Sequence, residues 1–242
     1  MAASGRLSRR NFLVTSGTGA AALCVSGNAG GYTGAEMRAR AAAGDTLTGI
    51  SKWELDTPAL CVDVDKLSSN IETMRTRLRE MKVVSRPHAK THKSPTIAKL
   101  QLAAGSVGIC AAKLGEAEVL AAHGIQPILM TTSNVTAGKI RRAMALRKTN
   151  SQFIQAVDYP QNARDLNDAA KAAGIVADVV VDVAVGTRSG VPAGDLAVAL
   201  AQLVDTLPNL KLRGIISYDG GDRKSTRLNS SHLPTSRMPS SA

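Results

Sequence analysis

The chain is poor in aromatic residues, with one Trp, three Tyr and two Phe among 242 residues. Proteins that bind single-stranded nucleic acids stack the bases on aromatic side chains, so this scarcity argues against a nucleic acid partner. The formal net charge of +11 does not change that conclusion, because the first 29 and the last 21 residues contribute +3 each and leave +5 for the middle. We therefore expect no nucleic acid partner.

The chain also has no long apolar run that would serve as a stable membrane anchor. The best candidate, residues 12–25, is short and rich in Gly, Ala and Thr. It follows a basic region, and the string Ser8-Arg9-Arg10-Asn11-Phe12-Leu13-Val14 resembles the twin-arginine export signal. We therefore interpret residues 1–29 as a signal peptide cleaved near Asn28-Ala29, which implies export of a folded protein to the periplasm.

Cysteine is scarce as well, with three residues in the chain. Cys24 leaves with the signal peptide, so only Cys61 and Cys110 remain. The two thiols could pair in an oxidising compartment. Both lie in apolar, strand-like runs, however, and we expect buried free thiols instead.

No Gly-rich nucleotide-binding fingerprint follows any of the predicted strands, which weakens a Rossmann-type interpretation. Strand patterns instead alternate with helix patterns of ten or more residues, as in parallel βαβ units. Nearly continuous apolar strands indicate burial on both faces, so a (β/α) barrel and a doubly wound sheet both fit. The predicted strands span 57–64, 83–90, 107–112, 127–131, 153–157, 177–185 and 212–217, and the helices between the later ones span 95–104, 114–123, 136–148, 161–173 and 194–207.

The N-terminal part of the mature chain looks less regular. Residues 30–52 are rich in Ala and Gly and are predicted to form a linker. After the strand at 57–64, Asp65 is expected to cap a helix. The apolar face of that helix is predicted from helical spacing, and its members are Leu67, Ile71, Met74, Leu78 and Met81.

The most informative stretch is Ser85-Arg86-Pro87-His88-Ala89-Lys90-Thr91-His92-Lys93. It follows two valines, so it reads as a strand running into a loop, with Arg86, His88 and Lys90 on one face. Neighbouring cations disfavour the ammonium form of a lysine, which leaves more of the free amine that Schiff-base chemistry needs. A cluster of this kind, directly before a capped helix, is a candidate catalytic site.

With these residues in hand, the sequence resembles the fold-type III pyridoxal-phosphate enzymes, and in particular the D-threonine aldolase / D-serine dehydratase family. The resemblance extends over roughly residues 57 to 221. The motifs that carry it are Thr57-Pro58-Ala59-Leu60, Arg86-Pro87-His88-Ala89-Lys90-Thr91-His92-Lys93-Ser94-Pro95, Gly108-Ile109-Cys110-Ala111-Ala112-Lys113, Arg188-Ser189-Gly190-Val191 and Ser217-Tyr218-Asp219-Gly220.

The resemblance implies a role for four residues. Lys90 is the Schiff-base lysine, and His88, Arg188 and Tyr218 contact the cofactor, pyridoxal 5'-phosphate. The cofactor acts as an electron sink while the protein orients the bond to be broken. The substrate class is D-amino acids, and the resemblance favours cleavage as by a D-threonine aldolase to glycine and an aldehyde. A D-serine dehydratase, an amino-acid racemase and a non-catalytic pyridoxal-phosphate-binding module are the alternatives.

The implied fold is an α/β (β/α)8 TIM barrel of the alanine racemase type. About six of its eight strands are present, those from 83–90 to 212–217, within a partial barrel over residues 53–221. In this family a C-terminal β domain carries the ligands of a divalent metal (Mn, Mg or Zn), and that domain is missing here, so no metal ligand is assigned in this chain. We expect the full-length protein to be a monomer or a homodimer.

Residues 222–242 have no apolar periodicity. The string from Asp222 to His232 reads as the translation of a common short-read sequencing adapter, and residues 236–242 match the adapter's far end. We therefore interpret residues 222–242 as an adapter-derived, non-native tail. His232 is accordingly not a candidate metal ligand or catalytic base.

Overall fold

The computed structural model describes residues 31–185 and 189–219, so the expected signal peptide, Arg188 and the expected adapter-derived tail lie outside the described residues. The chain divides into two compact units, and the boundary in the sequence falls between Leu67 and Ser68. No helix in the described part of the chain is both long and apolar enough to cross a membrane.

The first unit is more ordered than its composition predicted. The segment expected to be a linker contains the helix α2 (Gly34–Ala42) and is followed by a 3-10 turn, η1 (Lys52–Glu54). Both elements begin with a capping box. The side chain of Thr33 accepts from the backbone of Glu36, whose carboxylate accepts in return from the backbone of Thr33, and Ser51 begins η1 in the same way. These caps satisfy N–H groups that a helix start otherwise leaves unpaired, which explains the local order.

The prediction of a strand at residues 57–64 is wrong. Residues 57–63 form neither a helix nor a strand. The apolar side chains that suggested the strand are exposed, with Leu60 at 104% and Val62 at 55% of their reference areas. A strand needs a neighbouring backbone to pair its N–H and C=O groups, and within the described part of the chain this segment has none.

The helix that follows, α3 (Val64–Glu80), begins earlier than expected. The carboxylate of Asp63, and not that of Asp65, accepts the backbone N–H of Lys66 at 3.0 Å. None of the residues of α3 is buried. Of its predicted apolar face, Leu67, Ile71 and Leu78 are half-buried, while Met74 and Met81 are exposed.

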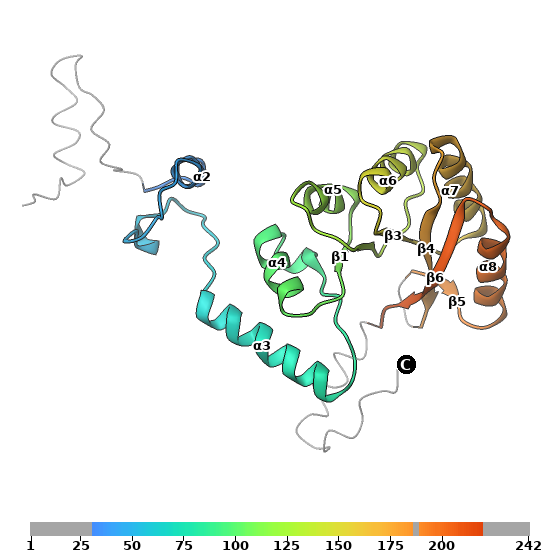
Figure 1. The fold of residues 1–242 in the computed structure, drawn as a ribbon, viewed down its shortest axis with the longest axis horizontal. Coiled ribbons are helices and arrows are strands. Elements are labelled where there is room, and N and C mark those ends of the chain that lie inside the picture. Colours follow the sequence, from blue (N-terminus) through green and yellow to red (C-terminus); the bar gives the residue numbers. More distant parts are fainter. Residues whose placement is uncertain (1–30, 186–188, 220–242) are drawn as a thin grey trace, which may run out of the picture. The chain divides into compact units, whose positions relative to one another are not determined.

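The second unit is built on an all-parallel sheet, as the alternating pattern predicted (Figure 1). Strands β1 to β4 are neighbours in chain order, and β5 and β6 both pair with β4. Within the described residues the sheet stays open, as an incomplete barrel would. The strands are β1 (Ile109–Ala111), β2 (Ile128–Met130), β3 (Phe153–Val157), β4 (Ala177–Ala184), β5 (Val191–Pro192) and β6 (Leu210–Ser217).

The strand predicted at residues 83–90 is only partly present. This segment runs alongside β1, with the carbonyls of Ser85 and Pro87 accepting backbone N–H groups from Val107 and Cys110 at 2.9 and 2.8 Å. It contributes a single bridge, from His88 to Cys110, before the chain turns into the 3-10 element η2 (Ala89–Thr91). The turn ends the extended backbone at the point where the predicted site begins.

Helices α4 to α8 cover one face of the sheet (Figure 1), close to their predicted bounds. Their apolar side chains and alternate strand residues such as Val179 and Val181 form the main core. On the opposite sheet face Cys110, Leu129, Ala156 and Val180 form a smaller cluster. This second face corresponds to the interior of a barrel. The helices are α4 (Pro95–Ala103), α5 (Leu114–Ala122), α6 (Ala137–Thr149), α7 (Pro160–Ala173) and α8 (Asp195–Thr206).

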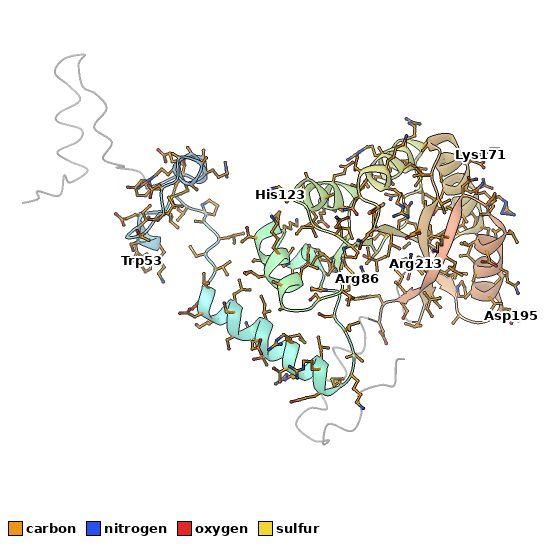
Figure 2. All side chains as sticks on the ribbon, viewed as in Figure 1. Trp53, Arg86, His123, Lys171, Asp195 and Arg213 are labelled. Atoms are coloured by element: carbon orange, nitrogen blue, oxygen red, sulfur yellow. The ribbon has the colours of Figure 1, made fainter. Side chains whose placement is uncertain are left out.

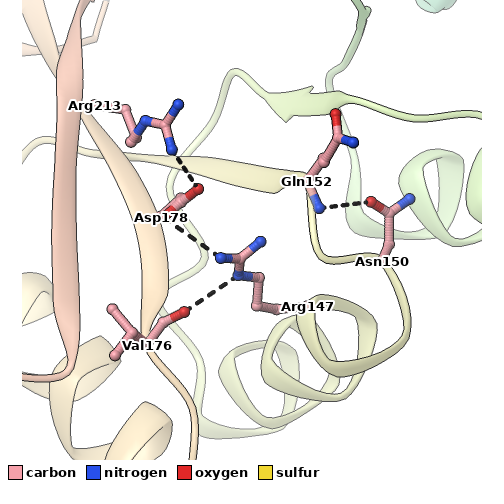
Figure 3. A network of polar contacts seen from close by, with 6 residues as sticks. All are labelled: Arg147, Asn150, Gln152, Val176, Asp178 and Arg213. Atoms are coloured by element: carbon pink, nitrogen blue, oxygen red, sulfur yellow. Dashed lines mark hydrogen bonds and ion pairs between the residues drawn. The ribbon is translucent and has the colours of Figure 1, made fainter.

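A polar network centred on Asp178 ties the start of β4 to its neighbours (Figure 3). The buried carboxylate of Asp178 pairs with Arg147 from α6 at 3.4 Å and with Arg213 from β6 at 3.1 Å. Arg147 also donates through Nε to the carbonyl of Val176 at 3.2 Å. The network therefore joins a strand pair to a covering helix at the end of the sheet away from Lys90.

Candidate active site

Three of the four predicted site residues, His88, Lys90 and Tyr218, lie at the edge of the sheet where parallel strands end. His88 is the N-cap of η2, and Lys90 lies within that turn. Thr131 follows β2, and Tyr218 follows β6. Active sites of parallel α/β barrels lie at this carboxyl edge, so the placement agrees with the function predicted for the motif.

His88 is fixed by both ring nitrogens. Its Nδ1 accepts the backbone N–H of Lys90 at 3.3 Å, and its Nε2 lies 3.2 Å from the hydroxyl of Thr131. Burial lowers the pKa of His88 below its usual value, and the positive charge of Lys90 lowers it further, against a smaller opposing effect from Glu116. His88 is therefore a neutral imidazole at physiological pH.

Lys90 and Tyr218 meet across the sheet. The Nζ atom of Lys90 lies 5.5 Å from the centroid of the Tyr218 ring, within the range of a cation–π contact. Both side chains are exposed at the sheet edge. The structure thus joins two of the predicted site residues, which come from the first and the last segments of the described sheet.

Arg86 lies next to β1, on the opposite sheet face from the helices (Figure 2). A Cβ atom built on Gly108 would lie only 2.2 Å from Nη1 of Arg86, so only glycine leaves room for this guanidinium. That Nη1 atom is buried and has no hydrogen-bond partner among the described residues. The motif string identified Arg86, but the need for Gly108 to accommodate it could not be read from sequence spacing.

We expected both remaining cysteines to be buried free thiols, and this is correct for only one of them. Both are free, but Cys61 is exposed and only Cys110 is buried. Burial raises the pKa of Cys110 to about 11, although Arg86 and Lys90 act in the opposite direction. Cys110 therefore remains a neutral thiol beside the site.

Two carboxylates near the ends of β3 and β4 were not identified from the sequence. Asp182 is buried, accepts a weak bond from Ser189 at 3.4 Å, and has its pKa raised chiefly by burial and then by Asp158. Asp158 accepts a bond from Ser133 at 2.8 Å. Sequence spacing does not reveal that acidic groups from two separate strands lie close together, so neither carboxylate was recognised as part of a site.

Arg188, the remaining predicted cofactor contact, lies outside the described residues. No group of three or more His, Cys, Asp or Glu side chains suited to a metal is found among residues 31–185 and 189–219. A groove of about 580 Å³ lies between α5 and α6, where Glu118 and Arg142 form an ion pair. It belongs to the helical layer and includes none of the predicted site residues.

The chain is similar to several known proteins. A 3-hydroxy-D-aspartate aldolase of Paracoccus denitrificans is 36% identical over 178 residues, which are 73% of this chain and 46% of that protein. The crystal structure of D-threonine aldolase from Filomicrobium marinum matches with a TM-score of 0.67 and 39% identity, over 69% of this chain and 45% of the other. For D-threo-3-hydroxyaspartate dehydratase from Delftia sp. HT23 the values are 0.63 and 32%, over 67% and 43%.

The chain thus spans a little under half the length of these relatives. Residues 62–230 match the family described as alanine racemase, N-terminal domain. The match ends beyond Gly221, where we expect the adapter-derived tail to begin. Since this match covers well over half of the chain, the chain belongs to the alanine racemase N-terminal domain family.

Proposed function

We propose that this chain forms the cofactor-binding domain of a pyridoxal-phosphate-dependent lyase that acts on D-3-hydroxy amino acids. The favoured reaction is the cleavage of the Cα–Cβ bond to glycine and an aldehyde, as by a D-threonine aldolase. The observation that carries the proposal is the position of Lys90, an exposed amine at the carboxyl edge of a parallel sheet and beside the Tyr218 ring. The names of the aldolase relatives support the choice of reaction.

The described residues fit pyridoxal phosphate, which is an anionic aromatic aldehyde. The exposed side chain of Lys90 makes its amine accessible to an aldehyde. The Tyr218 ring offers a flat surface within 5.5 Å of that amine. The unpaired guanidinium atom of Arg86 adds positive charge on the same sheet face as His88. Lys90 would hold the cofactor covalently through Nζ, and Tyr218 would lie against it.

When bound, pyridoxal phosphate supplies an electron sink for the carbon whose bond is broken. The chain's own residues supply position. His88 ties the backbone of Lys90 to the sheet through its bond with Thr131. Cys110, held as a neutral thiol by burial, does not compete with Lys90 for an aldehyde, because the thiolate is the reactive form of cysteine.

A dehydratase is the second candidate, because D-threo-3-hydroxyaspartate dehydratase from Delftia sp. HT23 is also similar to this chain. That reaction removes the α-proton and then water, and so differs from aldol cleavage in the bond that breaks first. A racemase or a non-catalytic binding module would use the same lysine. Any divalent metal would be held by ligands of the C-terminal β domain that the family resemblance implies.

Covalent capture of the cofactor tests the proposal on the chain itself. After incubation with pyridoxal phosphate, borohydride reduction and peptide mapping should locate the cofactor on Lys90, and a Lys90→Ala variant should lose it. Lys93→Ala and Lys113→Ala are matched controls that should keep it. Cofactor found on Lys93 or Lys113 in place of Lys90 would show the assignment to be wrong.

The reaction itself is tested with the gene product translated from adapter-trimmed reads. With D-threonine, an aldolase yields glycine and acetaldehyde, a dehydratase yields 2-oxobutyrate and ammonia, and a racemase yields the α-epimer. Glycine in equal amount to acetaldehyde would support the favoured reaction. Either of the other product sets would replace it with the matching alternative, and no turnover of D-3-hydroxy amino acids would contradict the proposal.

A further inference from the structure

We propose that Thr131 is a positioning residue, which accepts the Nε2–H of His88 and thereby fixes the ring and the turn that carries Lys90. Thr131 lies 43 positions after His88 and belongs to none of the motifs recognised in the sequence. The hydrogen bonding of His88 and Thr131 does not depend on any cofactor. Its consequence for the reactivity of Lys90 rests on the function proposed above.

The direction of the hydrogen bonds follows from the backbone of Lys90. Its N–H can only donate, so Nδ1 of His88 must present a lone pair to it at 3.3 Å. A neutral imidazole carries one proton, which must then be on Nε2. That N–H donates to the hydroxyl oxygen of Thr131 at 3.2 Å. The hydroxyl of Thr131 donates a hydrogen bond to the carbonyl of Ala111 at 3.3 Å, so each group in the series has one consistent role as donor or acceptor.

Thr131 is itself held firmly by the sheet. Its backbone N–H donates to the same carbonyl of Ala111 at 2.9 Å, directly after the paired strands β1 and β2. The series therefore crosses three neighbouring strand ends, those of the His88 segment, β1 and β2. The bond to Thr131 therefore fixes the orientation of the His88 ring, and the bond from the Lys90 backbone to the same ring fixes the turn η2.

Neighbouring charges favour the same state of His88. A proton on Nδ1 would set two donors against each other at the Lys90 backbone, and the Lys90 ammonium opposes a positive ring. Glu116 from α5 is the group that favours the charged ring, and its effect is smaller than that of burial and of Lys90. With both nitrogens engaged, His88 has no free site for carrying a proton to or from a substrate. Its role at this site is to position Lys90.

The next residue provides a matched control. Thr132 donates its hydroxyl proton to the carbonyl of Ala112 at 2.7 Å, in the same manner as Thr131 does to Ala111. Thr132 makes no contact with His88 in the described structure. A Thr132→Val change therefore removes an equivalent hydroxyl one position away and leaves the His88 ring untouched.

Nitrogen NMR of the full chain labelled with ¹⁵N-histidine reads the tautomer directly, with His88 assigned from the signals lost in a His88→Gln variant. Wild type, Thr131→Ser and Thr132→Val should show a bare Nδ1 and a protonated Nε2. Thr131→Val should keep the proton on Nε2, because the Lys90 backbone N–H still requires a bare Nδ1, but its Nε2 signal should shift because the hydrogen-bond acceptor is lost. A protonated Nδ1 in the wild type, or an unchanged Nε2 signal in Thr131→Val, would overturn the inference.

The second readout concerns Lys90. In the absence of the Thr131 hydroxyl, borohydride-fixed pyridoxal phosphate on Lys90 should accumulate about fivefold more slowly, the equivalent of one lost hydrogen bond. Thr131→Ser should restore the rate, and Thr132→Val should not change it. Equal rates in all four proteins would refute the effect on Lys90. If no variant captured cofactor on Lys90, the proposed function would fail, while the nitrogen NMR measurement would still decide the role of Thr131.

Discussion

The Lys90 ammonium lies over the ring of Tyr218, 5.5 Å from its centroid, although the two residues come from opposite ends of the described sheet. Contacts of this kind contribute about 0.5–1 kcal/mol at exposed sites. The contact therefore adds little to the stability of the domain. Its importance is that it places an aromatic surface beside the one amine that we expect to bind the cofactor.

Changing Tyr218 should alter the cofactor adduct and not the fold. Tyr218→Phe keeps the ring and should leave cofactor capture on Lys90 within about twofold of wild type. Tyr218→Ala removes the ring and should weaken the adduct by about three- to fivefold, as expected for a loss near 1 kcal/mol. Titration of the reduced adduct against pyridoxal phosphate measures both. Equal affinity in the Ala and Phe variants would show that the ring is not part of the site.

Adding one methyl group at Gly108 should destabilise the domain. The new Cβ would lie 2.9 Å from the backbone carbonyl oxygen of Pro127 as well as 2.2 Å from Nη1 of Arg86, and the backbone of Gly108 has φ = +150°, where side chains are strained. We expect Gly108→Ala to cost about 1–3 kcal/mol of unfolding free energy in urea titrations, as overpacked sites do. Gly138→Ala is the matched control. Gly138 lies in helix α6 with nothing within 4 Å of the added atom, so that change should be neutral or stabilising.

The network around Asp178 predicts an order of effects. Asp178→Asn leaves the side chain of Arg147, which is only 15% exposed, without its counter-charge, and breaking such a buried pair costs about 3–5 kcal/mol. Arg213 is 47% exposed, so Arg213→Ala should cost at most about 1 kcal/mol. Urea midpoints of the two variants measure the difference. A larger loss in Arg213→Ala than in Asp178→Asn would contradict the burial that the network implies.

The thiols should react in a fixed order. Cys61 is exposed and should react readily with iodoacetamide at pH 8, whereas Cys110 should react only on unfolding, because burial raises its pKa to about 11. The same shift gives a pH dependence. The unfolded thiol ionises near pH 9 and the folded one near 11, so the contribution of Cys110 to stability is complete below pH 9 and lost between pH 9 and 11. Cys110→Ala should remove that part of the alkaline loss, and mass spectrometry of labelled peptides checks the order of reaction.

We propose that the chain is exported by the twin-arginine route, on the basis of Arg9-Arg10 and Phe12. Replacement of both arginines by lysine keeps the charge but removes the motif. A reporter fused after residue 29 should then stay in the cytoplasm, while the wild-type leader delivers it to the periplasm. Periplasmic delivery of the Lys-Lys variant at the wild-type level would refute the proposal.

The later strands and their helices could be predicted from sequence because their apolar residues bury one or both faces of a sheet, which leaves a plain pattern. The segment 57–64 has a similar pattern, yet it forms no strand and its Leu60 and Val62 are exposed. The prediction failed because a sequence pattern does not show whether a pairing partner exists. The strand β5 has only two residues, too few to produce any pattern. Lys90 was found from its motif. The bond between His88 and Thr131 depends on the parallel pairing of strands, which local spacing does not reveal.

The parallel order of the sheet also has a consequence for when the site can form. Lys90 emerges from the ribosome well before Tyr218, and the strands between them are connected through five helical crossovers that must be in place before the two meet. Non-local pairing of this kind is slow, because loop closure costs entropy before the contacts stabilise the chain. Cofactor capture by the completed Lys90–Tyr218 pair should therefore follow, and report, the last step in folding of the sheet, the docking of β6 against β4.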